Sequence, residues 1–250
     1  MNVYQRPQYY EIAFSFRDPR KEVDFFEAAI PKFSKVKVRS VFELGAGTCP
    51  YLEEWHQRGY RYFGLDASTE MIEFSRRRAH ELRGDLTLFR GDMVRFALGS
   101  HKFDLAYVLL GSLYVRSNAE FFTHLDSVSK VLNRGSLYLL DGVVRFNIVA
   151  KLEERWTMKQ GGIRVRAAYR PELVDPLEQT CVEHVILDVN DHGKTHRLES
   201  TLARKPFFPQ EFLLAVQIHK QFELVGWFMN FELRRPHGVT GRPIVILRKS

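Results

Sequence analysis

Short apolar runs alternate with longer amphipathic segments through the first part of the chain. The runs have the length and composition of strands, and the segments between them repeat apolar positions at helical spacing. This rhythm predicts strands at 38–44, 60–66, 86–92, 103–110 and 136–144, with helices at 51–59, 68–82 and 118–132. Ser68 is a suitable N-cap for the second of these helices. Five strands that alternate with helices favour an α/β fold with a parallel, doubly wound sheet.

The rhythm changes after residue 150, where strand-like runs follow one another without helices between them. Gly161 and Gly162 separate two such runs within 156–170, and the sequence NDHG turns the chain within 180–205. Both segments predict antiparallel β-hairpins. A helix and a final strand pair that completes a seven-stranded, mostly parallel sheet are then expected at 208–221, 222–233 and 242–249.

These patterns divide the chain into three expected parts. Residues 1–150 combine an N-terminal helical cover, including a helix at 19–33, with the strand–helix core. Residues 151–206 form a small antiparallel β insert, and residues 207–250 return to the core with the last helix and the last two strands.

Composition restricts the class of protein. The chain has 250 residues, of which 45% are hydrophobic and 13% aromatic, enough for a large core. Its apolar runs are too short to span a bilayer, and the N-terminus has no signal-peptide pattern. Cys49 and Cys181 are expected to be reduced thiols, so we expect a cytoplasmic protein without membrane association. The net charge of +7 is scattered along the chain, which favours an ordinary charged surface over a nucleic-acid-binding one.

The stretch VFELGAGTCPYLEEW, residues 41–55, carries the most specific signal. Gly45 and Gly47 follow a strand and precede a helix, so the backbone of this turn can approach a ligand closely. A nicotinamide site would need a third glycine where Pro50 stands, and a P-loop would need a lysine followed by serine or threonine. Since neither is present, these two ligand classes are disfavoured.

Six motifs, in order and at sensible spacing, resemble those of the class I S-adenosylmethionine (SAM)-dependent methyltransferases, over essentially the whole chain. They are Glu43, Gly45 and Gly47 with Cys49 in place of a third glycine; Asp66; Gly91, Asp92 and Met93; Phe103, Asp104 and Leu105; the passage VLNRGSLYLLD; and a terminal strand pair. The resemblance implies a Rossmann-like core, SAM as the cofactor and S-adenosylhomocysteine as its product.

The resemblance also implies a set of cofactor-binding residues. Asp66, about 20 residues past the turn, is suited to accept hydrogen bonds from the ribose hydroxyls, although it could also serve as a helix cap. Asp92 is expected to meet the adenine amino group, with Met71 and Met93 against the ring. Glu43 is expected to anchor the glycine turn and the methionyl amine. The full expected set is Glu43, Gly45, Ala46, Gly47, Asp66, Ala67, Ser68, Met71, Gly91, Asp92, Met93 and Leu109.

The acceptor site is expected in loops at the carboxyl ends of the parallel strands. Methyl transfer from a sulfonium is an in-line displacement, so the protein mainly positions the acceptor and excludes water. A general base is needed only where the acceptor must lose a proton. The candidate catalytic residues are Tyr10, Tyr114 and His237, and the candidate substrate residues are Tyr114, Arg145, Arg235 and His237, each with an ordinary structural role as the alternative. No metal site is expected.

The sequence LLGS after the fourth predicted strand differs from the N/D-P-P-Y/F motif of family members that methylate nucleic-acid amino groups. The insert at 151–206 is similar to that of small-molecule N- and O-methyltransferases, in which it forms a lid or a dimer contact. We therefore expect a SAM-dependent methyltransferase with a small-molecule N or O acceptor, acting as a monomer or homodimer. An RNA methyltransferase and a non-catalytic SAM-binding module of the same fold are the alternatives.

Overall fold

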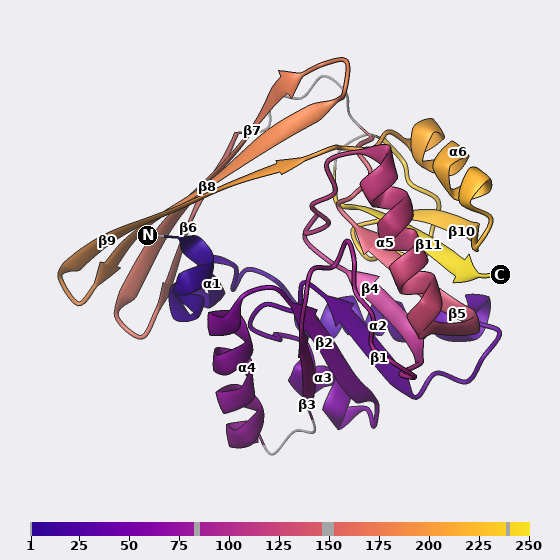
Figure 1. Ribbon diagram of the computed structural model, residues 1–250. Helices are drawn as coiled ribbons and strands as arrows, with labels where there is room; N and C mark the ends of the chain where they lie inside the picture. Colours follow the sequence, from indigo (N-terminus) through magenta and orange to yellow (C-terminus); the bar gives the residue numbers. More distant parts are fainter. Residues whose placement is uncertain (1, 83–85, 147–152, 239–240) are drawn as a thin grey trace.

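A seven-stranded sheet forms the centre of the protein in the computed structural model, which describes residues 2–82, 86–146, 153–238 and 241–250 (Figure 1). The strand order is β10-β11-β5-β4-β1-β2-β3, and β11 alone among these seven described strands runs against the others. The strands are β1 (Ser40–Leu44), β2 (Arg61–Asp66), β3 (Leu86–Arg90), β4 (Phe103–Val108), β5 (Leu132–Asp141), β10 (Phe222–Met229) and β11 (Pro243–Lys249). The predicted doubly wound, mostly parallel sheet is confirmed.

Helices cover both faces of this sheet. Helices α5 (Asn118–Val131) and α6 (Pro209–His219) pack against one face, and α2 (Pro19–Phe33) and α3 (Leu52–Gln57) against the other, while α4 (Thr69–Leu82) follows β2. Side chains of β1 alternate between the two cores, because successive residues of a strand point to opposite faces. Phe42 and Leu44 belong to the first core, and Val41 to the second.

The register of the parallel strands aligns their carboxyl ends. Leu44 at the end of β1 is paired with Leu65 on one side and with Val108 on the other. The turns that follow β1, β2, β3 and β4 therefore lie side by side along one edge of the sheet. That edge is the place where α/β proteins of this type bind ligands.

A second, four-stranded antiparallel sheet lies beside the core, in the order β6-β7-β8-β9 (Figure 1). Its strands are β6 (Glu154–Gln160), β7 (Ile163–Asp175), β8 (Thr180–Asp191) and β9 (Lys194–Arg204). The N-terminal helices η1 (Val3–Gln5) and α1 (Pro7–Ala13) pack on this sheet in a third apolar cluster. The two predicted hairpins are confirmed, whereas the three-part division of the chain stays a prediction.

Most predicted element boundaries agree with the structure to within a few residues. Ser68 caps α4, because its hydroxyl accepts a hydrogen bond from the backbone N–H of Met71 at 3.2 Å. Two strands are longer than predicted at one end: β5 begins at Leu132 and not at residue 136, and β7 continues to Asp175 and does not end at residue 170. Leu132 pairs with Phe103 of β4, so the segment NRGS is part of an irregular strand.

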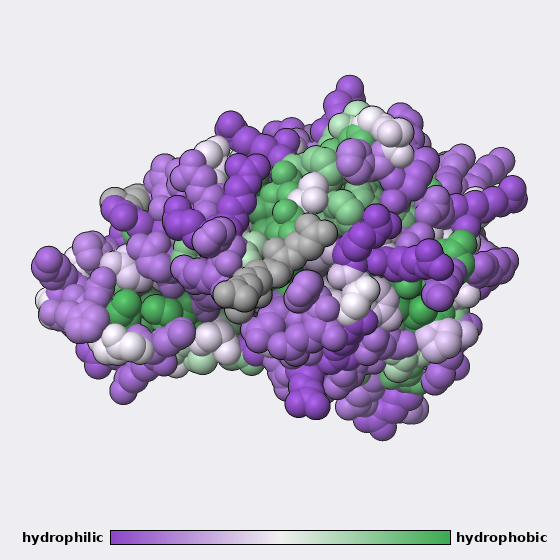
Figure 2. All heavy atoms as spheres, turned by 90° about the horizontal axis from the view of Figure 1, so that it is seen from below, coloured by the Kyte–Doolittle hydropathy of each residue, from purple (hydrophilic) through white to green (hydrophobic). Residues whose placement is uncertain are grey.

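Hydrophilic residues cover most of the face that Figure 2 shows, and apolar residues gather near its middle. None of the described helices is long and apolar enough to cross a membrane.

One carboxyl group is buried in the core below the glycine turn. Glu43 of β1 is 3% exposed, and it accepts hydrogen bonds from the hydroxyls of Tyr62 and Tyr107. Burial raises the pKa of Glu43 to about 8, although the two hydroxyls and the charge of Arg17 act in the opposite direction. Below this pH the Glu43 side chain is therefore a neutral acid in the folded chain.

The free energy of unfolding of the native chain should fall as the pH rises from about 4 to about 8. We predict that this fall is smaller in the variant Glu43→Gln. An unfolded glutamate titrates near about 4.3, so between that pH and about 8 the folded chain holds a proton that the unfolded chain releases. The free energy of unfolding then falls as the pH rises through this interval. Glutamine stays neutral, and the variant should gain on the order of a few kcal/mol relative to the native chain by pH 8.

Urea unfolding at several pH values between 5 and 9 measures this effect. Glu53→Gln, on the exposed side of α3, is the matched control and should follow the native pH dependence. Parallel curves for the Glu43 variant and the native protein would contradict the prediction.

Candidate functional site

A cavity of about 590 Å³ lies over the turns that follow β1, β2, β3 and β4. Helix η1 and Tyr10 of α1 close it from the side of the second sheet. It is lined by Asn2, Tyr4, Gln5, Tyr10, Gly45, Gly47, Leu65, Asp66, Ala67, Ser68, Thr69, Glu70, Met71, Arg90, Gly91, Asp92, Met93, Ser112, Tyr114 and Leu202. We call it the donor cavity.

The glycine turn forms the floor of the donor cavity. Gly45 and Gly47 have φ angles of +68° and +54°, in the left-handed region that favours glycine. A Cβ atom on Gly45 would lie 2.9 Å from the terminal methyl carbon of Met93, so the cradle exists because this residue has no side chain. Cys49 also has a positive φ, of +50°, and its thiol is fully buried in the core.

The carboxylate of Asp66 joins two of the turns. Its Oδ2 accepts a hydrogen bond from the backbone N–H of Gly47 at 2.7 Å, and its Oδ1 accepts one from the N–H of Ser68 at 2.8 Å. Burial raises the pKa of Asp66, while these N–H groups act to lower it. Each oxygen keeps lone-pair capacity toward the cavity, because a carboxylate oxygen can accept more than one hydrogen bond.

Nine of the twelve predicted cofactor residues line the donor cavity. They are Gly45, Gly47, Asp66, Ala67, Ser68, Met71, Gly91, Asp92 and Met93. Glu43, Ala46 and Leu109 do not line it. Glu43 faces Tyr62 and Tyr107 below the turn, so the expectation that it meets the methionyl amine is not supported by its position. Ala46 and Leu109 are buried in the same core.

A second cavity of about 900 Å³ adjoins the donor cavity, and we call it the acceptor cavity. It lies between the core, helix α1 and the second sheet. The two cavities share the wall residues Tyr4, Tyr10, Ser112 and Tyr114. Burial raises the pKa of the three tyrosines, so at neutral pH each keeps its hydroxyl proton. They are therefore suited to orient a group by hydrogen bonding, and not to act as bases.

The predicted acceptor residues divide into two sets. Tyr10, Tyr114 and Arg145 line the acceptor cavity. Arg235 and His237 are exposed and line neither cavity, so the structure does not bring these two together with the tyrosines. Their loop joins β10 to β11; Phe231 at its start is buried in the core, whereas the side chains of Arg235 and His237 are exposed.

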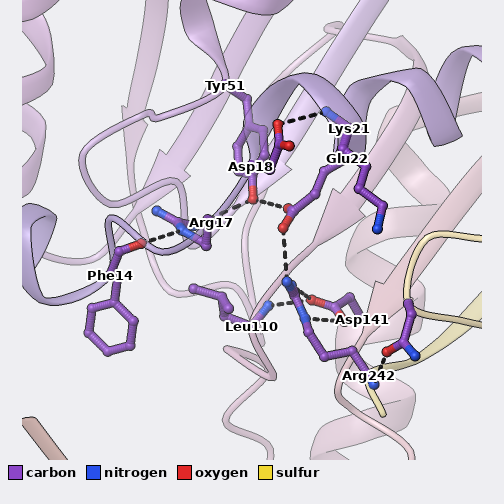
Figure 3. A network of polar contacts seen from close by, with 10 residues as sticks. Phe14, Arg17, Asp18, Lys21, Glu22, Tyr51, Leu110, Asp141 and Arg242 are labelled. Atoms are coloured by element: carbon purple, nitrogen blue, oxygen red, sulfur yellow. Dashed lines mark hydrogen bonds and ion pairs between the residues drawn. The ribbon is translucent and has the colours of Figure 1, made fainter. Parts of the chain in front are cut away.

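An ion-pair network lies at the base of the acceptor cavity (Figure 3). Arg242, just before β11, contacts Asp141 at the end of β5 and donates to Glu22 of α2 at 2.8 Å. Asp141 is fully buried and also accepts from the backbone N–H of Leu110 at 2.8 Å. Glu22 in turn accepts from the hydroxyl of Tyr51. The network holds a core helix, the end of β5 and the start of β11 in fixed positions.

The sequence prediction does not include several charged residues at or beside these cavities, among them Asp141 and Arg242 of the network, Glu183, Arg204 and Arg17. Glu183 and Arg204 are buried in β8 and β9 and line the acceptor cavity, with Arg204 Nε 3.4 Å from a Glu183 oxygen. Arg17 lies beside Tyr51, to whose hydroxyl it donates at 3.5 Å, and its charge lowers the pKa of nearby Glu43. A charged residue at an inward position of a predicted hairpin is the signal that would have indicated Glu183.

Residues 41–135 match the model of a methyltransferase domain family. The whole chain is similar to solved structures with low sequence identity. A SAM-dependent methyltransferase from Clostridium acetobutylicum ATCC 824 is 14% identical, with a TM-score of 0.80 over 96% of each chain. CalS10, an amino pentose methyltransferase from Micromonospora echinaspora solved with SAM bound, is 18% identical, with a TM-score of 0.74 over 96% of each chain.

The sugar N-methyltransferase KedS8 from Streptoalloteichus sp. ATCC 53650 is 16% identical, with a TM-score of 0.74 over 96% of this chain and 93% of its own. No curated protein sequence matches this chain. Residues 41–135 are thus similar to a methyltransferase domain, and the chain as a whole has the fold of the class I SAM-dependent methyltransferases, as its motifs predict.

Proposed function

We propose that this protein transfers the methyl group of SAM to a nitrogen or oxygen atom of a small molecule. The observation that carries the proposal is the shared wall of the two cavities at Tyr4, Tyr10, Ser112 and Tyr114. A methyl group that passes from a donor in one cavity to an acceptor in the other must cross this wall.

The donor cavity fits SAM in both shape and chemistry. Gly45 and Gly47 leave room for the methionyl chain, and Asp66 is placed to accept hydrogen bonds from the ribose hydroxyls. Met71 and Met93 supply apolar contacts for the adenine ring, with Asp92 at its edge. Once bound, the sulfonium supplies an activated methyl group, and the protein has to hold donor and acceptor in line.

Arg17 is suited to the methionyl carboxylate. Its side chain lies close to Tyr10, which lines the donor cavity, and to Glu43 below the glycine turn. Its Nε donates to the carbonyl of Phe14 at 3.4 Å and its Nη1 to the hydroxyl of Tyr51 at 3.5 Å, and both distances are long for hydrogen bonds. A carboxylate would provide a stronger partner for this guanidinium.

The tyrosines of the shared wall position the acceptor and exclude water. The ring of Tyr10 lies over the glycine turn, where a Cβ on Gly47 would be 3.9 Å from a ring carbon. It also contacts the ring of Phe14 in a tilted arrangement, at a centroid distance of 4.5 Å. Tyr4 and Tyr114 both belong to this wall, and the protonated hydroxyl of Tyr114 can orient the atom that receives the methyl group.

A nitrogen atom is the favoured acceptor. CalS10 is named as an amino pentose methyltransferase, KedS8 as a sugar N-methyltransferase and MtfA as a glycopeptide N-methyltransferase. The acceptor cavity is enclosed by the second sheet and α1, a shape that suits a small molecule better than a nucleic-acid strand.

Asp66→Asn should weaken the binding of S-adenosylhomocysteine by at least about tenfold, or 1.4 kcal/mol. The amide retains one oxygen, so it cannot accept from Gly47, Ser68 and the ribose together. Isothermal titration calorimetry of the full chain measures the change.

Asp104→Asn is the matched control for this experiment. Asp104 lies at the opposite end of the sheet and also accepts from backbone N–H groups, those of Arg39 and Ser40. It should lower stability while leaving the affinity within about threefold, equivalent to roughly 0.6 kcal/mol. If the native chain binds no S-adenosylhomocysteine, the proposed function is wrong.

Tyr114→Phe should separate binding of the donor from methyl transfer. The substitution keeps the ring and removes the hydroxyl that orients the acceptor, so the affinity for S-adenosylhomocysteine should stay within about threefold of the native value. With radiolabelled SAM and a panel of amino sugars and aromatic amines, the rate of transfer should fall by about 10- to 100-fold. An unchanged rate would show that Tyr114 is a structural residue.

A further inference from the structure

Aromatic side chains form a continuous ladder through the acceptor cavity. Ring centroids are separated by 5.8 Å from Tyr4 to Tyr10, by 4.5 Å from Tyr10 to Phe14 and by 5.7 Å from Phe14 to Trp156. Phe16, which also contacts Trp156, ends the ladder and is 51% exposed. All five rings line the cavity, so an apolar, aromatic path leads from solvent to the shared wall.

Arg145 lines the same cavity, and among the described residues only one nitrogen of its guanidinium group is hydrogen-bonded. One terminal nitrogen, Nη2, donates to the hydroxyl of Tyr169 at 3.0 Å and to Glu183 at 3.2 Å. Within the part of the chain that the structure describes, neither Nε nor Nη1 of Arg145 has a hydrogen-bond partner. Its side chain is 24% exposed, which leaves the guanidinium accessible from the cavity.

The charges around Arg145 do not balance. Glu183 is the one described carboxylate that pairs with both Arg145 and Arg204. Arg204 is committed elsewhere as well, since it donates to the carbonyl oxygens of Gly111 at 2.6 Å and Gly142 at 3.2 Å. Two guanidinium groups that share one carboxylate leave a net positive charge in a partly desolvated cavity, where it attracts an anion more strongly than it would in water.

The other charged groups at the cavity base do not offset this excess. Asp141 and Glu22 are two carboxylates that share Arg242. The guanidinium of Arg17 near Glu22 supplies the second positive charge, so this group is balanced in itself. Glu154 and Arg155 line the cavity as exposed residues of β6, and water screens charges in such positions. The positive charge therefore centres on Arg145.

We infer that the acceptor is an aromatic molecule that carries an anionic group, either a carboxylate or a phosphate ester. Its ring system lies along Tyr10, Phe14 and Trp156, its anionic group meets Arg145, and the atom to be methylated lies at Tyr114. A volume of about 900 Å³ accommodates a molecule of this size, and it is large for a single pentose. This inference rests on the proposed function for the assignment of this cavity to the acceptor.

Calorimetry with three naphthalene probes tests the inference directly. The probes are 2-naphthoate, 2-naphthyl phosphate and the neutral 2-naphthylmethanol, each titrated into the full chain with and without S-adenosylhomocysteine. At least one anionic probe should bind about tenfold or more tightly than the neutral probe. The better of the two anions identifies the source of the charge, carboxylate or phosphate. Equal binding of all three probes, or no binding at all, overturns the inference.

Arg145→Gln should reduce this preference for the anionic probe to about threefold or less. Arg166→Gln, an exposed arginine on β7 that lines neither cavity, is the matched control and should retain the native preference. Arg145→Lys keeps the charge and should retain part of it, which separates recognition of the anion from a loss of structure. An undiminished preference in Arg145→Gln overturns the inference.

Trp156→Leu should weaken all three probes to a similar extent, because it shortens the aromatic ladder without changing the charge. Binding of S-adenosylhomocysteine is measured on every sample and reports on the donor cavity separately. A native chain that binds this ligand but shows no preference for anions refutes the inference and leaves the proposed function standing. A chain that selects anionic probes but binds no S-adenosylhomocysteine refutes the proposed function.

Discussion

The carboxylate of Asp66 connects the turns on which the donor cavity is built. The turn after β1 follows an unusual backbone path, with positive φ at Gly45, Gly47 and Cys49, and such a path needs support from its neighbours. Asp66 supplies that support through the N–H of Gly47, while it holds the start of α4 through Ser68. The same side chain thus sets the shape of the cradle and presents its oxygens to it.

An ion-pair network supports the base of the acceptor cavity in a similar way, near the ends of β5 and β11. Arg242, Asp141 and Glu22 come from three elements far apart in sequence, and none of them would be stable there as an isolated charge. Because the group is hydrogen-bonded on several sides, it fixes the positions of β5, β11 and α2 relative to one another. Both cavities therefore rest on rigid elements, which is what an in-line reaction requires.

The sequence was sufficient to predict the core and much of the donor cavity. Gly45 follows a predicted strand, and Asp66 and Asp92 are the last residues of two others, so the parallel register alone places them at one edge. Glu43 is harder to place from its motif. It alternates with Phe42 and Leu44 along β1, so its side chain faces Tyr107 and the core on the α2 and α3 side of the sheet, and not the cavity.

The acceptor cavity was harder to predict because it is made by the docking of one sheet on another. Glu183 and Arg204 belong to strands of the insert, and nothing in their local pattern indicates which core loops they meet. Arg235 and His237 lie in a loop that joins two core strands, which favours a place at the site, but both side chains are exposed. Contacts of this kind depend on tertiary placement, which neither periodicity nor spacing determines.

The N-terminal segment, η1 and α1, lines both cavities and is hydrogen-bonded to the second sheet. Trp156 of the second sheet donates to the carbonyl of Ala13 at 2.7 Å, and the hydroxyl of Tyr9 donates to Asp191 at 2.8 Å. Leu202 of the same sheet reaches the wall of the donor cavity. A substitution in the insert that reshapes the acceptor cavity will thus also shift the cover of the donor cavity. Selection for a new acceptor would have to preserve that cover, so acceptor preference and donor affinity are expected to evolve together in this chain.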